Sequence, residues 1–312
     1  MVNGNSPCNL SGTITRRALL RFAVGISLGS LSCTPGNLSV RGRKPVRFGI
    51  ITDCHYADAE PQGTRFYRES LGKLAQCVDR MNAERVDFLI ELGDFKDQNR
   101  PAVEEKTLVH LRDIEAAFRR FQGRRYHVLG NHDMDSISKP QFLSHVENTG
   151  MGAGRSYYSF DVRGLHCIVL DANYRPDGSD YDHGNFDWTN ANIPAHEIDW
   201  LQQDLATCPG HVVVFIHQRL DGTGPVFVKN APQVRQILQA SNRVLAVFQG
   251  HDHEGDYRHL DGIPYYTLKA VVEGSGADNN SYALVEVHSD QSLTVTGYHR
   301  ASGMQLSHAG AT

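Results

Sequence analysis

The chain has 312 residues, of which 31 are Lys or Arg and 35 are Asp or Glu, so its formal net charge is −4. Hydrophobic residues make up 40% of it, a share typical of a globular protein rather than of a disordered or collagen-like chain. A duplex-DNA binder needs a basic stripe to neutralise phosphates, and the sequence contains no such stripe. Nucleic acid is therefore disfavoured as the main partner. The sequence has no internal repeat and no long polar linker after residue 45, which favours one sizeable core.

The N-terminus has the features of an export signal. Residues 15–21 read Thr-Arg-Arg-Ala-Leu-Leu-Arg and precede the apolar run 22–31. Paired arginines before a modest apolar stretch are typical of the bacterial Tat route, and the stretch is shorter than the ~20 residues that span a bilayer. We expect residues 1–32 to be a Tat-type export signal and residues 33–45 to be a linker. The protein would then be periplasmic or otherwise extracytoplasmic, without a transmembrane span.

Cys33 leaves alternatives open at the end of this signal. The small residues Ser30 and Ser32 suit cleavage by signal peptidase just before Cys33. The same cysteine could instead carry a lipid anchor, although Ser30 stands where a lipobox usually has Leu. An ordinary N-terminal helix with two adjacent arginines is the alternative to any export signal.

Further along the chain, short apolar runs alternate with helical patterns. The apolar runs predict buried strands at residues 46–51, 86–92, 126–129, 165–170, 212–216 and 244–248. The periodicity predicts helices over residues 64–82, 102–121, 195–206 and 231–240. Alternation over residues 282–298, around a polar turn, predicts a hairpin. This order predicts an α/β fold, in which polar residues beyond the carboxyl ends of strands build the site.

Polar residues with metal-binding atoms follow five of these runs. They are Asp53, His55, Asp94, Asn131, His132, His217, His251 and His253. A set without thiolates favours Mn, Fe, Zn or Mg over a structural zinc. Seven of these eight donors already suffice for two divalent ions if one carboxylate bridges. Two ions clamp both ends of an in-line phosphoryl displacement and lower the pKa of a shared water enough to give a bridging hydroxide near neutral pH.

Each fragment alone is weak, because a strand-end Asp can simply cap the next helix. Together they resemble the complete signature of the calcineurin-like metallophosphoesterases. The matching motifs lie between residues 46 and about 255 and read Asp53-x-His55, Gly93-Asp94-x-x-Asp97, Gly130-Asn131-His132-Asp133, His217 and Gly250-His251-x-His253. The resemblance implies an α/β fold, namely a four-layer αββα sandwich with a dinuclear metal site at strand carboxyl ends. It also implies a hydrolase that acts on phosphoric ester or diphosphate bonds, over residues 46–300, followed by a C-terminal tail over 301–312.

The resemblance implies a role for each site residue. One ion would be bound by Asp53, His55, Asp94 and His253, and the other by Asp94, Asn131, His217 and His251. Asp94 would therefore bridge the ions. His132 would bind neither ion but would protonate the leaving oxygen or stabilise the transition state, and Asp97 would orient its ring. This agrees with the need of a general acid for a partner that fixes its tautomer.

Differences between this sequence and two related groups of proteins disfavour membership of those groups. Purple acid phosphatases have Tyr where Asp97 stands, so their iron–tyrosinate site is disfavoured. Scaffold proteins of this fold that lack catalysis tend to lose metal ligands, and this sequence has lost none. A non-catalytic metal-binding interaction module is the alternative from another class.

The substrate is less well defined. Residues 48–58 and 63–71 resemble the manganese-dependent ADP-ribose/CDP-alcohol diphosphatase subgroup, and residues 185–188 and 197–201 resemble it more loosely. This implies manganese and a small-molecule phosphoester substrate that contains a nucleotide. Some members of the subgroup depart from Asp-x-His at the first motif, whereas this chain keeps His55. The alternative is a broad-specificity exported phosphomonoesterase or phosphodiesterase for phosphate scavenging, which export itself favours.

Two features outside the motifs bear on the substrate. Segment 174–188 has four aromatic residues, which could stack on a base or pack only on one another: Tyr174, Tyr181, Phe186 and Trp188. Arg65 and Arg68 could bind a phosphate, or they could form the solvated face of a helix.

Overall fold

The computed structural model describes residues 44–307. The expected Tat-type signal (1–32) and the proposed anchor residue Cys33 lie outside the described residues, as does most of the expected linker. Within residues 44–307, no helix combines the length and the apolar character that a membrane span requires. The four cysteines of this part are buried and free of disulfide bonds.

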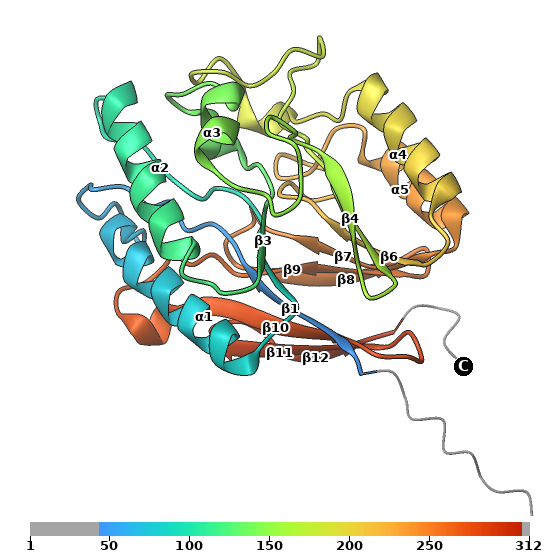
Figure 1. Ribbon diagram of the computed structural model, residues 1–312. Helices are drawn as coiled ribbons and strands as arrows, with labels where there is room; N and C mark the ends of the chain where they lie inside the picture. Colours follow the sequence, from blue (N-terminus) through green and yellow to red (C-terminus); the bar gives the residue numbers. More distant parts are fainter. Residues whose placement is uncertain (1–43, 308–312) are drawn as a thin grey trace, which may run out of the picture. The chain divides into compact units, whose positions relative to one another are not determined.

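Two six-stranded sheets lie face to face at the centre of the fold (Figure 1). The first has the order β12-β11-β10-β1-β2-β3 and the second the order β4-β5-β6-β7-β9-β8. The first consists of β1 (Val46–Ile51), β2 (Phe88–Glu91), β3 (Arg124–His127), β10 (Ser281–Val287), β11 (Leu293–His299) and β12 (Met304–Leu306). The second consists of β4 (Tyr158–Val162), β5 (Leu165–Val169), β6 (His211–Phe215), β7 (Val244–Gln249), β8 (Asp256–Leu260) and β9 (Ile263–Thr267).

Helices cover the outer face of each sheet. The helices on the first sheet are α1 (Ser70–Glu84), α2 (Glu104–Phe118) and α3 (Lys139–His145). The helices on the second sheet are α4 (Ala195–Thr207) and α5 (Ala231–Ser241). Figure 1 shows α1 and α2 on one side of the molecule and α4 and α5 on the other. The protein is thus the four-layer αββα sandwich that the sequence predicted.

The strand sequences alternate between two apolar cores. In β1, Phe48 and Ile50 point between the two sheets, and Ile51 points toward the helices. Phe48 stacks on Phe88 of the neighbouring strand, with ring centroids 4.8 Å apart. Because each sheet is covered by the other sheet on one face and by helices on the other, its central strands are apolar on both faces. This explains why the sequence shows continuous apolar runs there.

The strand directions determine where the site forms. Strands β1, β2 and β3 run parallel, and so do β5, β6 and β7. The carboxyl ends of parallel strands lie at the same edge of a sheet. The loops that follow β1, β2, β3, β6 and β7 therefore gather at one end of the sandwich.

The elements differ from the sequence expectation in three places. Helix α1 begins at Ser70 rather than near residue 64, because Arg65 forms bridges with Gln62 and Glu273 instead of a helical turn. The fold also extends past the predicted boundary at residue 300, since β12 pairs with β11 and Leu306 is buried. The elements that the sequence did not predict are short or lack a long apolar run: α3, β4, β8, β9 and β12.

A buried histidine links the first sheet to α2. His127 Nδ1 lies 2.9 Å from Glu91 Oε1, and His127 Nε2 lies 3.2 Å from Glu115 Oε2. Burial lowers the pKa of His127, but the carboxylates of Glu115 and Glu91 outweigh burial and raise this pKa to about 9. His127 is therefore an imidazolium at neutral pH, paired on both sides.

This pair of contacts makes the stability of the fold depend on pH. The pKa of His127 in the folded state is above its ordinary value of 6.5, so its stabilising contribution is complete below pH 6.5 and is lost as the pH rises through about 9. We expect a loss of roughly 1–3 kcal/mol from this residue. Urea unfolding below pH 6.5 and above pH 9 should show this loss in the wild type and not in His127→Gln. Equal pH slopes for the two proteins would show that another group titrates.

Candidate metal centre

Six side chains with metal-binding atoms converge where strands of both sheets end. The seventh ligand expected from the sequence, Asn131, precedes His132, whose backbone N–H donates to Asp94 Oδ1 at 2.7 Å. All seven expected ligands lie on the loops after β1, β2, β3, β6 and β7: Asp53, His55, Asp94, Asn131, His217, His251 and His253. The first five are buried, and the last two are half-buried. The cluster is therefore buried on one side and open to solvent on the other.

The expected ligands form two groups that meet at Asp94, and His55 also belongs to a third group of close donors with Asp97 and His132. The ligand atoms of Asp53, His55 and His253 all lie within 4.8 Å of one another, and those of Asp94, His217 and His251 do the same. Asp94 Oδ2 lies 3.1 Å from His217 Nε2 and 3.5 Å from His55 Nε2. One carboxylate oxygen thus stands between the two groups, which is the position of a bridging ligand.

The imidazole rings are held from outside the cluster. In three of them the Nδ1 atom donates to an oxygen, and the contacts are His55 to Asp97 Oδ2 at 3.2 Å, His217 to the carbonyl of Leu92 at 2.8 Å and His253 to Glu273 Oε1 at 2.6 Å. Their Nε2 atoms are left facing the carboxylates of the cluster. Metal-ligating histidines have this arrangement, because the outer hydrogen bond fixes the tautomer and the ring orientation.

Unpaired buried atoms give a second test of whether the residues fit metal ions. Within residues 44–307, Asp53 Oδ1, Asn131 Oδ1 and His251 Nε2 are buried and have no hydrogen-bond partner. Such atoms are rare because each costs about 1–3 kcal/mol when it is left unpaired. Two of them lie in the cluster and the third lies on an adjoining loop, and such carboxylate, imidazole and amide donors fit divalent cations.

The carboxylates of the cluster are ionised. Burial raises the pKa of Asp53, but the neighbouring His217, His253 and His55 outweigh burial and hold it well below its ordinary value. Asp53 Oδ2 accepts from Thr52 Oγ1 at 2.7 Å, which leaves Oδ1 as the unpaired atom. The negative charge is therefore available at the oxygen that faces the histidines.

The backbone of the ligand loops is strained. Four candidate ligands have left-handed backbone, with φ of 52° at Asp53, 46° at His55, 53° at Asp94 and 68° at His251. This conformation costs non-glycine residues about 1–3 kcal/mol each and persists where the surrounding structure enforces it. Here the loops after β1 and β2 are joined by hydrogen bonds from Asp53 N to Gly93 O and from His55 N to Asp94 O.

Two glycines allow the loops to approach one another. A Cβ atom at Gly130 would lie 2.1 Å from Asp94 N, and one at Gly250 would lie 2.2 Å from Thr52 Oγ1. No other residue fits these positions without moving a ligand loop. The glycines of the sequence motifs are therefore explained by close contact between loops.

Asp133 joins the loops after β2 and β3. Its carboxylate accepts from Gly130 N at 2.8 Å, Phe95 N at 3.0 Å and Asp94 N at 3.1 Å. Burial, with the charges of Glu91 and Asp94, raises its pKa to about 8. The motif in the sequence contained Asp133 but gave it no role, and the structure shows that it fixes the backbone at Asp94.

His132 lies on the solvent side of the cluster, with 29% of its side chain exposed. Its Nδ1 donates to Asp135 Oδ2 at 2.7 Å, whereas Asp97 Oδ2 is 3.8 Å away and contacts His55 instead. Asp135 therefore has the position that the sequence analysis gave to Asp97. A 3-10 turn over Asn131–Met134 brings Asp135 back to His132, and no periodicity in the sequence predicts this turn.

The other features noted in the sequence are the arginines Arg65 and Arg68 and the aromatic segment 174–188. Arg68 pairs with Asp58 and Glu60 at the surface, which is the solvated alternative. Arg65 lies nearer the cluster, with Nε 3.7 Å from Glu273 Oε1. The aromatic segment packs largely on itself, because Tyr174 and Tyr181 are buried and Tyr181 stacks on Phe186 at 4.1 Å. Trp188 is the exception and is exposed.

Comparison with known proteins agrees with this geometry. Residues 46–255 match the family model described as calcineurin-like phosphoesterase. The chain belongs to this family. It is a hydrolase that acts on phosphoester bonds, as the motifs predicted.

The individual proteins to which the chain is similar have low sequence identity to it. The chain is 25% identical to a protein of Oryza sativa subsp. japonica named manganese-dependent ADP-ribose/CDP-alcohol diphosphatase, over 85% of this chain and 95% of that protein. It is 20% identical to a probable cyclic nucleotide phosphodiesterase of Psychrobacter arcticus, over 71% of this chain and 78% of that protein. Its fold resembles a dimetal phosphatase from Danio rerio, with a TM-score of 0.75 and 23% identity over 85% of this chain and 100% of that chain.

A buried arginine ties together two ligand loops of the phosphoesterase. Arg219 follows His217 by two residues, and only 3% of its side chain is exposed. It contacts both oxygens of Asp221 at 3.0 and 2.7 Å, and it donates to Asp252 Oδ2 at 2.6 Å and Asp256 Oδ2 at 2.5 Å. Asp252 lies between the two ligands of the His-x-His motif. Arg219 therefore holds the loop after β7 against the loop after β6, a link that the sequence did not reveal.

We expect Arg219→Lys to lower the manganese affinity of the centre about 10-fold or more, because Lys cannot make the same forked contacts. Arg258→Lys is the matched control, since Arg258 contacts Asp256 at 3.1 Å but has 44% of its side chain exposed. Its effect on affinity should stay within about 2-fold. Metal titration of metal-free protein, followed by calorimetry, measures both. A loss of unfolding free energy in Arg219→Lys with unchanged metal affinity would contradict a positioning role.

Proposed function

We propose that this phosphoesterase hydrolyses the diphosphate linkage of a nucleotide such as ADP-ribose or a CDP-alcohol. The observation that carries the proposal is the ordered donor set of the candidate metal centre, with Asp94 Oδ2 between two groups of ligands. The relatives named manganese-dependent ADP-ribose/CDP-alcohol diphosphatase support the substrate class and favour manganese over iron, zinc or magnesium.

The two groups support the ligand sets that the family resemblance implies, in which Asp94 serves both ions and Asn131 completes the second set. One ion would be held by Asp53, His55, Asp94 and His253, and the other by Asp94, Asn131, His217 and His251. When bound, the two ions supply a water nucleophile at neutral pH and positive charge for the phosphoryl oxygens. Because Asp94 would serve both ions, it fixes their separation.

His132 would act on the leaving group. Its Nδ1 is engaged by Asp135, so Nε2 is the nitrogen that is free to meet the substrate. As the oxygen of water bonds to phosphorus and the bond from phosphorus to the leaving oxygen breaks, Nε2 would give its proton to that oxygen. The carboxylates of Asp94 and Asp135 outweigh burial and raise the pKa of His132, which favours the imidazolium that carries this proton on Nε2. Asp97 orients His55.

A broad-specificity phosphomonoesterase or phosphodiesterase is the second candidate function. Similarity to proteins named probable cyclic nucleotide phosphodiesterase favours it.

We also propose that residues 1–32 export the protein by the Tat route to the periplasm, with Cys33 as the first residue after cleavage or as a lipid anchor. An exported enzyme of this kind would release phosphate from varied esters.

The substrate proposal is tested by offering four compounds to the manganese-loaded mature protein. They are ADP-ribose, CDP-choline, bis-p-nitrophenyl phosphate and p-nitrophenyl phosphate. We expect AMP from ADP-ribose and CMP from CDP-choline, with slower release of p-nitrophenol from either nitrophenyl ester. Faster hydrolysis of the nitrophenyl esters would overturn the diphosphatase proposal in favour of the second candidate. Two bound ions without hydrolysis of any of the four compounds would contradict both and favour a non-catalytic module.

The role of His132 is tested with His132→Ala, which should keep both ions and lose rate by about 10²–10⁴-fold. The loss should be greatest for substrates with poor leaving groups, because these depend most on protonation of the leaving oxygen. His288→Ala, which alters a histidine outside the centre, is the control. Loss of bound metal in His132→Ala would make His132 a ligand rather than a proton donor.

A further inference from the structure

An exposed indole stands beside the candidate metal centre. Trp188 is 44% exposed, and its ring centroid lies 5.5 Å from that of His251 at an interplanar angle of 63°. Tyr257 is the other strongly exposed aromatic side chain within residues 44–307. Because the indole stands at a candidate metal ligand, its exposed face is accessible to a ligand of the centre.

The segment around Trp188 is held in one conformation. Trp188 begins a 3-10 turn, in which Asp187 Oδ1 accepts from Thr189 N at 3.0 Å and from Thr189 Oγ1 at 2.7 Å. Below this turn, Tyr181 stacks on Phe186, and the Tyr181 hydroxyl donates to Asp187 O at 3.3 Å. These contacts hold the backbone next to Trp188. A loop that is already ordered loses little conformational entropy when a ligand binds to it.

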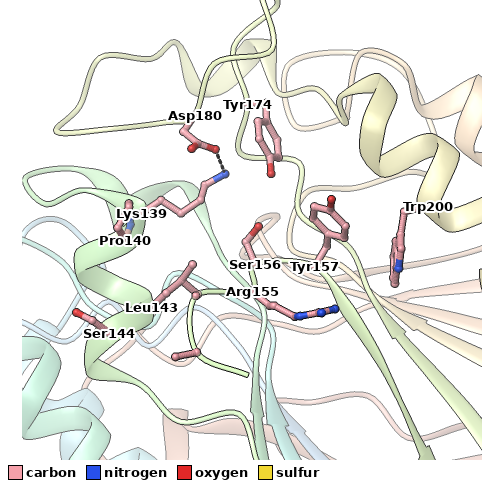
Figure 2. Close-up of a pocket in the computed structure, with 12 residues that line it drawn as sticks. Lys139, Pro140, Leu143, Ser144, Arg155, Ser156, Tyr157, Tyr174, Asp180 and Trp200 are labelled. Carbon is pink, nitrogen blue, oxygen red and sulfur yellow. Dashed lines mark ion pairs between the residues drawn. The ribbon is translucent and has the colours of Figure 1, made fainter. Parts of the chain in front are cut away.

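A second aromatic surface offers an alternative. A cavity of about 710 Å³ lies between α3 and a wall formed by Tyr157, Tyr174 and Trp200 (Figure 2). The ammonium group of Lys139 at its edge is already paired with Asp171 and Asp180, at 2.8 and 2.6 Å. None of the residues that line this cavity is a candidate metal ligand. A nucleobase bound in this cavity would therefore not contact the candidate metal ligands.

We propose that Trp188 is the platform on which the nucleobase of the substrate stacks. The inference rests on the proposed function, and it assigns the base to the side of the centre formed by His251 and His217. Stacking on an indole accepts purines and pyrimidines alike, because every base has a π-face. Relatives whose name includes both ADP-ribose and CDP-alcohols act on both kinds of base, which a platform allows and a hydrogen-bonding pocket for one base would not.

The two tryptophans of the chain provide a direct test. Because the sequence contains only Trp188 and Trp200, Trp200→Phe leaves Trp188 as the single indole, and Trp188→Phe leaves Trp200. The two variants are titrated, manganese-loaded, with AMP and with ribose 5-phosphate, which lacks the base. We expect AMP to quench Trp188 fluorescence saturably and ribose 5-phosphate to leave it unchanged. Quenching of Trp200 instead, or equal responses to the two ligands, would overturn the proposal.

Kinetics give a second measurement. Trp188→Ala should raise the KM for ADP-ribose and CDP-choline by about 5- to 100-fold, with a smaller change in kcat, because stacking contributes to binding rather than to bond breaking. Trp188→Phe should recover part of this loss. Trp200→Phe is the matched control and should leave both constants within 2-fold. Unchanged KM in Trp188→Ala would overturn the proposal.

The two proposals fail in distinguishable ways. If the wild type cleaves both nucleotides but Trp188→Ala has the wild-type KM, the platform is wrong and the diphosphatase function stands. If the wild type cleaves only the nitrophenyl esters, the diphosphatase function is wrong and the platform falls with it. Metal content measured in every variant should remain at two ions, since Trp188 is not a ligand.

Discussion

One carboxylate connects the two halves of the molecule. Asp94, after β2 of the first sheet, approaches His55 from the same sheet and His217 from the second. In the interior of the sandwich the two sheets meet through apolar side chains, which set no precise distance. A charged contact at the end of the sandwich does set one, because the oxygen and both imidazoles must stay within a few ångströms.

The neighbouring features keep Asp94 in its place. Asp133 binds the backbone N–H of Asp94, and Gly130 leaves room for it. The left-handed φ of 53° at Asp94 is then imposed by contacts from several sides rather than by its own preference. Three of the four candidate histidine ligands are likewise held from outside the cluster, since their Nδ1 atoms are bound by oxygens there. Rigidity of the centre thus comes from residues that are not themselves candidate ligands.

The sequence predicted the parts of this arrangement that depend on residue type and order. Buried strands are recognisable as apolar runs, and parallel strands must end at one edge, so Asp53, Asp94 and His217 could be expected to meet. The partner of His132 could not be predicted, because it depends on a 3-10 turn that returns Asp135 to the ring. Arg219 was missed for a similar reason, since two of its three carboxylates come from loops whose paths no periodicity encodes and the third begins β8, which the sequence did not predict.

The aromatic segment shows the same limit. Tyr181, Phe186 and Trp188 are alike in the sequence, yet two of them stack on each other and the third is exposed. Burial in an irregular loop depends on hydrogen bonds such as those of Asp187, and these follow from the folded path of the chain. The aromatic composition of the segment indicated that a nucleobase could bind to it. The three-dimensional arrangement shows which two rings stack on each other and which ring is exposed.

The spacing of the donors along the chain has a consequence for how metal is acquired. The candidate ligands extend from Asp53 to His253, and each group takes residues from both sheets. A complete set of donors therefore exists only after the sheets have packed, so that each ion would bind the finished fold and add its binding free energy to it. Sites with such mixed oxygen and nitrogen donors accept several divalent metals, and the ion that is most available at the moment of folding is the one they retain. The compartment in which the chain folds would then decide the metal with which the enzyme works.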